Sequence, residues 1–213
     1  MKKDFKITGV HYHWGPFLFR STISDEFRDL ILKEGHRARK ITPSMNDKLA
    51  GHLDEQYELP PEPFMGHLTS YLAAYCVGFN KWRGRGQMKP DAKLLKLWIN
   101  FMKAGDFNPP HDHSGDLSFV IFPEVPKKLI KENQAYQGTM KGPGAIAWMI
   151  EGSNNRMDID GVYVLPSDKD IYIFPASLKH WVFPFKSKVT RISVSGNLVF
   201  TAHAKAVKKW FGK

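Results

Sequence analysis

Two histidines one residue apart, His111 and His113, form the first pattern in this sequence that suggests chemistry. Side chains alternate between the two faces of an extended backbone, so both imidazoles would point the same way and Asp112 the opposite way. The pair is therefore a candidate for binding one metal ion. Imidazole is a ligand for iron, zinc, copper and nickel alike, so the ligand type alone does not choose the metal.

A third histidine, His180, follows the apolar segment 171–175 and a short turn. Downstream, Arg191, Ser193 and Ser195 alternate with apolar residues, so a strand would place a cation and two hydroxyls on one face. A guanidinium offers a rigid fork of donors that pairs well with a carboxylate. The sequence thus combines a candidate metal site with a candidate carboxylate site.

The order and spacing of these residues resemble the 2-oxoglutarate- and Fe(II)-dependent oxygenases, close to the prolyl-hydroxylase-like branch and its phage-encoded relatives. The resemblance covers residues 93–200, and its pieces are specific only in combination. They are Trp98-Ile99-Asn100, His111-Asp112-His113 followed by Leu117-Ser118, Phe174-Pro175 leading to His180, and Arg191-Ile192-Ser193 with Asn197.

The resemblance implies Fe(II) as metal, 2-oxoglutarate as cosubstrate, with ascorbate as a further cofactor candidate, and hydroxylation coupled to decarboxylation of 2-oxoglutarate to succinate. Carried over residue by residue, it makes His111 the first metal ligand and His180 the distal one. Arg191 would bind the far carboxylate of the cosubstrate, with Ser193 assisting. Asn100 would hydrogen-bond the same cosubstrate or orient a ligand.

Residue 113 departs from the family's commonest pattern, because histidine stands where a carboxylate ligand is usual. Three interpretations are open. His113 is itself a ligand in a three-histidine site; Asp116 or Asp112 supplies a carboxylate after a local rearrangement; or metal affinity is lost. Strand alternation favours the first.

These residues need a β-rich framework to position them. Short segments with strand-type patterns, separated by Gly, Pro, Asn and Asp, predict an antiparallel sandwich or barrel. The resemblance implies a double-stranded β-helix, or jelly roll. The expected strands are 93–102, 117–122, 145–150, 161–165, 170–174, 181–185 and 189–200.

Residues 1–90 are predicted to be mostly helical, packed outside the β core. Ser24 is a candidate N-cap of a helix that Gly35 would stop. A short helix is predicted over 49–57 and an amphipathic helix over 64–82. We expect an α+β, mainly β fold with a single domain, 1–213, made of a helical layer (1–90), a jelly-roll core (91–200) and a basic tail (201–213).

Composition limits the remaining classes of function. The 213 residues carry a formal net charge of +10, but no nucleic-acid-binding motif accompanies it, so a nucleic-acid partner rests on charge alone. A single cysteine, Cys76, excludes intrachain disulfides and multi-cysteine metal sites. No apolar run is long enough to span a bilayer and no secretory leader is recognised, so we expect no membrane association and a cytoplasmic protein, in the host cytoplasm if phage-encoded.

Two other classes of function compete with the oxygenase. One is a non-catalytic jelly-roll or cupin-like protein that binds a metal or ligand, and the other is an oxygenase that modifies nucleic acid. The substrate is not defined by the sequence: a protein side chain, a free amino acid, a nucleobase and a small metabolite all remain candidates. The sequence is equally silent on oligomeric state.

Overall fold

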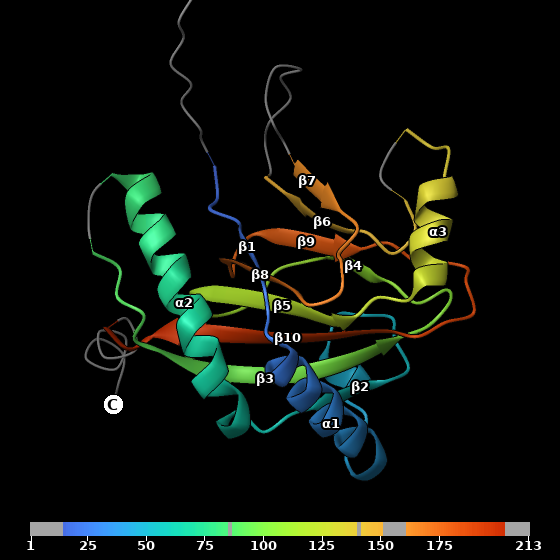
Figure 1. Cartoon of the computed structure of the whole chain (residues 1–213), viewed down its shortest axis with the longest axis horizontal. Helices are drawn as coiled ribbons and strands as arrows, with labels where there is room; N and C mark the ends of the chain where they lie inside the picture. Colours follow the sequence, from blue (N-terminus) through green and yellow to red (C-terminus); the bar gives the residue numbers. More distant parts are fainter. Residues whose placement is uncertain (1–14, 85–86, 140–141, 151–160, 203–213) are drawn as a thin grey trace, which may run out of the picture.

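The computed structural model describes residues 15–84, 87–139, 142–150 and 161–202. Two antiparallel sheets form the body of the protein (Figure 1). The main sheet has the order β1 (Phe19–Thr22), β8 (Asp170–Pro175), β5 (Leu117–Glu124), β10 (Arg191–Phe200), β3 (Ala92–Met102) and β2 (Gln56–Glu58). The second sheet has the order β4 (Asn108–His111), β9 (Lys179–Val182), β6 (Ile146–Met149) and β7 (Gly161–Val164).

Two helices, α1 (Asp25–Ile41) and α2 (Glu62–Arg83), cover the face of the main sheet that is turned away from the second sheet (Figure 1). A third helix, α3 (Lys127–Ala135), follows β5. The predicted fold class, mainly β with helices packed outside a two-sheet core, is confirmed. Residues 15–84 also contribute β1 and β2 to the edges of the main sheet, which the sequence pattern did not indicate.

Helix α1 begins where the sequence predicts but ends later. The Ser24 hydroxyl caps the helix by accepting a hydrogen bond of 3.2 Å from the Phe27 backbone N–H. The predicted stop at Gly35 is wrong, since the helix continues to Ile41. Gly35 is buried, and a Cβ there would lie 2.2 Å from Cδ1 of Ile99. This glycine therefore allows α1 to approach β3 closely and does not end the helix.

The predicted helix over 64–82 is confirmed as α2, but the one predicted over 49–57 is wrong. Gln56–Glu58 instead forms β2 and pairs with β3, with Gln56 opposite Asn100. A short 3-10 helix, Asn46–Lys48, precedes it. Pairing with an existing strand edge outweighs the local helical pattern here, because hydrogen bonds of the main sheet satisfy this backbone.

The seven predicted strands are all found, with ends that differ by a few residues. Strand β4 was not predicted, because its sequence Asn-Pro-Pro-His carries two prolines that cannot donate to a ladder. It lies at the edge of the second sheet, where prolines are tolerated. Of the predicted basic tail, 201–213, all but the first two residues lie outside the described residues.

Alternation along the central strands separates two cores. Ile99, Phe101, Ile192 and Val194 pack with α1 and α2 in one cluster. The side chains that alternate with such residues along the strands point to the opposite face of the sheet. Val120 is one of them, and it belongs to another cluster that faces the second sheet. The polar side chains of β3 and β10 share this inner face.

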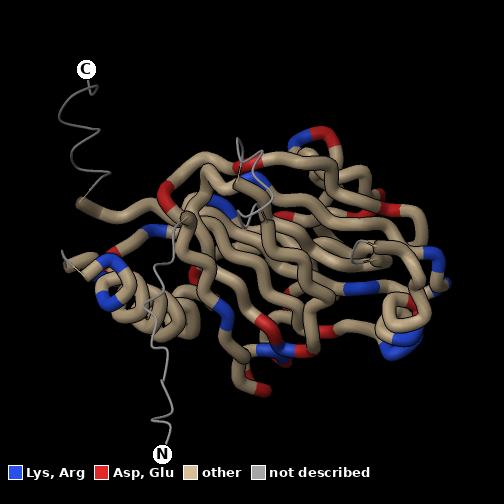
Figure 2. Tube along the Cα trace, turned by 90° about the horizontal axis from the view of Figure 1, so that it is seen from above, with Lys and Arg blue, Asp and Glu red and all other residues tan. Residues whose placement is uncertain are grey.

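Charges are scattered over the surface of the described residues. Figure 2 shows Lys and Arg interspersed with Asp and Glu along the trace. Among the described residues, no helix is both long and apolar enough to cross a membrane.

Candidate metal and cosubstrate site

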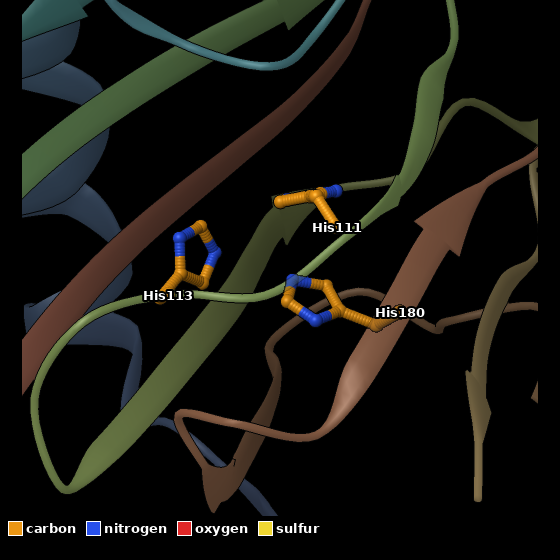
Figure 3. A group of neighbouring side chains, drawn as sticks. All are labelled: His111, His113 and His180. Atoms are coloured by element: carbon orange, nitrogen blue, oxygen red, sulfur yellow. The ribbon is translucent and has the colours of Figure 1, made fainter. Parts of the chain in front are cut away.

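Three histidines predicted as ligands come together between the sheets. One nitrogen from each of His111, His113 and His180 lies within 4.8 Å of the corresponding nitrogens of the other two (Figure 3). His111 ends β4 and is directly opposite His180 on β9, while His113 follows in the loop after β4. Backbone pairing of β4 with β9 therefore brings together imidazoles that are 69 residues apart in the sequence.

Hydrogen bonds fix the orientation of two of these rings. Nδ1 of His111 lies 2.7 Å from the Pro109 carbonyl oxygen, and Nδ1 of His180 lies 2.9 Å from that of Leu178. A carbonyl oxygen only accepts, so each Nδ1 carries the proton and each Nε2 keeps a free lone pair. Metal-ligating histidines commonly bond a carbonyl in this way through their other nitrogen.

Burial keeps the three imidazoles neutral. It lowers the pKa of His180 to about 3, with a further contribution from His111. It lowers the pKa of His113 to about 4, helped by His111 and Lys96, and lowers the pKa of His111 as well. At neutral pH the rings thus need not lose a proton before they bind a metal.

The loop that carries His113 is held on both sides. The His113 backbone N–H donates to the Ala176 carbonyl at 2.9 Å. Its ring packs edge-on against Trp98 of β3, with the ring centroids 5.5 Å apart. These contacts direct the His113 ring toward the other two histidines.

The two aspartates considered as alternative ligands lie elsewhere. Asp112 is exposed to solvent. The Asp116 carboxylate accepts a hydrogen bond of 2.7 Å from the Phe200 backbone N–H and so secures the end of β10. Within the described part of the chain, the group of side chains close enough to share a metal contains the three histidines and neither aspartate.

Arg191, the predicted carboxylate-binding residue, is buried on the inner face of β10. Its Nη1 donates to the Gly144 carbonyl at 2.7 Å and its guanidinium lies 5.2 Å from the centre of the Phe122 ring. Nε has no hydrogen-bond partner, and no acid pairs with Arg191 among the described residues. Burial lowers the pKa of this guanidinium to about 10, which still leaves it charged at neutral pH.

A chain of hydrogen bonds lies beside Arg191. The amide Nε2 of Gln56 donates to Oδ1 of Asn100 at 2.8 Å, and Nδ2 of Asn100 donates to Oγ of Ser193 at 3.3 Å. Since Ser193 accepts from Asn100, its own hydroxyl proton is left to donate to another group. Both predicted residues, Asn100 and Ser193, thus lie in one buried network.

All these side chains line one cavity, which holds about 530 Å³ of empty space including its opening to solvent. Sequence reasoning missed Gln56, Gly51 and Asn108, which also line it. Gln56 lay in a segment predicted as helix, and Gly51 is needed because a Cβ there would lie 2.1 Å from Oδ1 of Asn108. The only signal for Gly51 was the glycine itself.

The arrangement fits a ferrous ion and a dicarboxylic cosubstrate. Three neutral imidazoles are a donor set that suits iron. Arg191 is a buried cation without a carboxylate partner in the described structure, and Nε is a buried donor without an acceptor. A buried charge is strongly destabilising unless it is paired, so an anionic ligand is the partner this guanidinium lacks.

Comparison with known proteins agrees with this geometry. The family model described as 2OG-Fe(II) oxygenase matches residues 96–197, which contain every residue discussed above as ligand or carboxylate contact. The comparison with curated proteins gave no significant match.

Solved structures of similar fold include three that bear on this site. The viral collagen prolyl hydroxylase vCPH of Paramecium bursaria Chlorella virus-1, in complex with 2OG, has a TM-score of 0.55 and 11% identity over 86% of this chain and 96% of that one. HygX of Streptomyces hygroscopicus, with nickel and 2-oxoglutarate bound, has a TM-score of 0.54 and 10% identity over 88% of this chain and 83% of that one. The Trichoplax adhaerens prolyl hydroxylase was solved in complex with a peptide fragment of the hypoxia inducible factor oxygen degradation domain. It has a TM-score of 0.51 and 12% identity over 91% of this chain and 86% of that one.

The match across residues 96–197 supports the 2-oxoglutarate/Fe(II) oxygenase superfamily for this part of the chain, and solved prolyl hydroxylases share its fold. This match supports an oxidoreductase that uses Fe(II) and 2-oxoglutarate, and the three histidines are the residues that could hold the iron.

Proposed function

We propose that the protein hydroxylates its substrate and converts 2-oxoglutarate to succinate and carbon dioxide in the same reaction. The iron would be held by three histidines. His111 and His180 would bind it through Nε2, and His113 through the ring nitrogen that faces the other two histidines. Arg191 and Ser193 would hold the carboxylate of 2-oxoglutarate that is distant from the metal. The whole chain, 1–213, would act as one domain.

The overall reaction balances without further reactants. One atom of O2 enters succinate and the other enters the new hydroxyl group, while the bond between the carboxylate carbon and the keto carbon breaks to release carbon dioxide. When bound, iron supplies the site at which oxygen is activated. The protein's own task is to position the reactants and to exclude water.

The residues of the cavity can perform that task. The Arg191 guanidinium offers Nε, which is buried and without a partner, to a carboxylate. Ser193 has a hydroxyl proton free to donate to the same group, because Asn100 already donates to its oxygen. Gln56 in turn fixes Asn100, so the donors are oriented before the cosubstrate arrives. A prearranged set of donors binds at a lower cost in entropy than a flexible one.

The single observation that carries this proposal is that three convergent neutral imidazoles share one cavity with a buried Arg191 that no described acid pairs with. A non-catalytic jelly-roll protein that binds metal would account for the histidines. It would not account for the buried guanidinium, which costs stability unless an anion pairs with it.

Release of succinate tests the proposal. Purified protein with Fe(II), 2-oxoglutarate, ascorbate and oxygen should release succinate, slowly even without substrate, and Arg191→Met should release much less at the same iron content. His52→Ala is a matched control, since His52 stacks on Phe107 and is not part of the metal cluster. Tight metal binding without any succinate would instead support the non-catalytic alternative.

A further inference from the structure

The inner faces of β3 and β10 form a series of side-chain pairs that runs through the cavity. Arg191 is opposite Met102, Ser193 opposite Asn100, and Ser195 opposite Trp98. The next pair toward the start of β3 is Lys96 opposite Asn197. With about 3.3 Å per residue in a strand, Lys96 lies roughly 20 Å from the pair that contains Arg191. The two cations therefore stand at opposite ends of this series.

The metal cluster lies between these two ends. His113 packs against the Trp98 ring, and Lys96 Nζ lies 5.9 Å from the centre of the same ring. Lys96 thus lies beside the candidate iron site, on the side opposite Arg191.

Lys96 is half-buried, and no acidic side chain in the described part of the chain pairs with it. Lys103 pairs with Glu55 and Lys169 with Asp25, but no ion pair involves Lys96 among the described residues. None of these ion pairs joins the exposed Asp112 to Lys96. An ammonium group near an active site without a partner is available to a ligand.

The net charge of the site also favours a negatively charged ligand. Among the described residues that line the cavity, Arg191 is the charged one, and none is an acid. The three imidazole ligands are neutral, whereas a ligand set with a carboxylate would carry a negative charge. The charges of a ferrous ion, Arg191 and doubly negative 2-oxoglutarate therefore sum to one positive charge. Lys96 adds another just outside. The site is thus more positive than one with an aspartate ligand and favours a negatively charged substrate.

We propose that Lys96 is a specificity-determining residue that binds a carboxylate of the substrate, so that the enzyme acts on an acidic substrate. The inference rests on the proposed function for the location of iron and cosubstrate. The substrate's carboxylate would pair with the Lys96 ammonium beside Trp98, and this contact would hold the carbon to be hydroxylated near the histidine cluster.

Two probes that differ only in charge test this proposal. They are the α-amides of N-acetyl-L-glutamic acid and of N-acetyl-L-glutamine, which have nearly the same shape. The whole protein is loaded with Zn(II), which is diamagnetic, and with N-oxalylglycine, a mimic of 2-oxoglutarate that occupies the Arg191 side. Binding is followed by NMR through the Trp98 indole N–H resonance, assigned with Trp98→Phe.

The acidic probe should bind wild-type protein at least about tenfold more tightly than the neutral one, since a hydrogen bond to a charged group is worth roughly that much. Lys96→Met should bring the ratio close to one, and Lys96→Arg should largely keep it. Lys93→Met is the matched control, because it removes the same charge from an exposed position on the same strand and should leave the ratio unchanged.

Equal binding of the two probes to wild-type protein, binding of neither, or a preference that persists in Lys96→Met would each overturn the proposal. Succinate release by the same proteins, loaded instead with Fe(II) and 2-oxoglutarate, separates this result from the fate of the proposed function. Succinate without a charge preference refutes the role of Lys96 alone. A charge preference that depends on Lys96, without succinate, supports the anion site and refutes the oxygenase activity.

Discussion

The outer and inner faces of the main sheet use the same strands for different purposes. On β10, Ile192 and Val194 pack outward with α1 and α2, while Arg191 and Ser193 point inward to the cavity. The outer face is apolar and closely packed. The inner face near the histidines contains buried polar groups, and Arg191 Nε and Gln56 Oε1 have no hydrogen-bond partner among the described residues. We infer that the outer face stabilises the fold and that the inner face gives up some stability to bind ligands.

The largest effect is expected from removing a histidine at the inner face. His180→Ala should abolish turnover and lower metal affinity by more than the roughly 10–100-fold seen when only a hydrogen-bond partner of a ligand is removed. Metal titration of the wild-type and variant proteins measures this. If His180→Ala kept wild-type metal affinity, the histidine cluster would not be the metal site.

Ile99→Ala tests the outer face. This side chain is fully buried against α1, so its truncation should lower the free energy of unfolding by about 2–5 kcal/mol. The affinity of the folded protein for metal and 2-oxoglutarate should not change. Urea denaturation combined with ligand titration measures both quantities, and a large loss of cosubstrate affinity would show that the two faces are not separable.

A matched pair of substitutions sharpens this test. Gly35→Ala alone should destabilise the protein by about 1–3 kcal/mol, because the added methyl group meets Ile99. Combined with Ile99→Ala, which creates the missing space, it should cost much less than the sum of the two single changes. Additive costs would contradict the packing contact between α1 and β3.

Arg191→Met should separate the two faces in the opposite direction. Loss of charged hydrogen bonds should weaken 2-oxoglutarate binding by roughly 10–100-fold, while stability without ligand should stay the same or increase, since a buried cation is replaced by an apolar side chain. Calorimetric titration of 2-oxoglutarate into Mn(II)-loaded protein measures the first effect and urea denaturation the second. Unchanged cosubstrate affinity would place the carboxylate site elsewhere.

A pH dependence of stability is also expected from the inner face. His180 and His113 have pKa values of about 3 and 4 in the folded metal-free protein, below the ordinary value of 6.5. The unfolded chain therefore takes up protons first as the pH falls below 6.5, so stability is complete above that value and declines toward pH 4.

Urea midpoints of the metal-free protein between pH 7.5 and 5 measure this decline. His180→Gln should show a shallower decline than the wild type, because one of the groups whose pKa is lowered is gone. An identical slope in the two proteins would show that His180 does not titrate as its burial suggests.

The sequence predicted those parts of the structure where local and tertiary preferences agree. Alternation on 189–200 indicated the inward face of Arg191 and Ser193, and Ser24 marked the start of α1. Where the fold overrides local pattern, prediction failed. Gly35 resembled a helix stop because its role depends on Ile99, 64 residues away, and Gln56 lay in a segment with helical spacing although the edge of β3 makes it a strand.

The candidate site shows the same limit. The order of the histidines and the arginine is unusual enough to be recognised in the sequence. However, only the pairing of β4 with β9 shows that His111 and His180 meet. Lys96 gave no signal in the sequence, since one lysine among 31 basic residues has no distinguishing feature until its neighbours are known.

A crystal structure with Mn(II) and 2-oxoglutarate tests the central claim most directly. Anomalous scattering should give a single manganese peak about 2.1 Å from one nitrogen of each of His111, His113 and His180, the usual distance between a metal and imidazole. The far carboxylate of 2-oxoglutarate should contact Arg191. A metal that uses Asp112 or Asp116 in place of His113, or a cosubstrate bound away from Arg191, would contradict it.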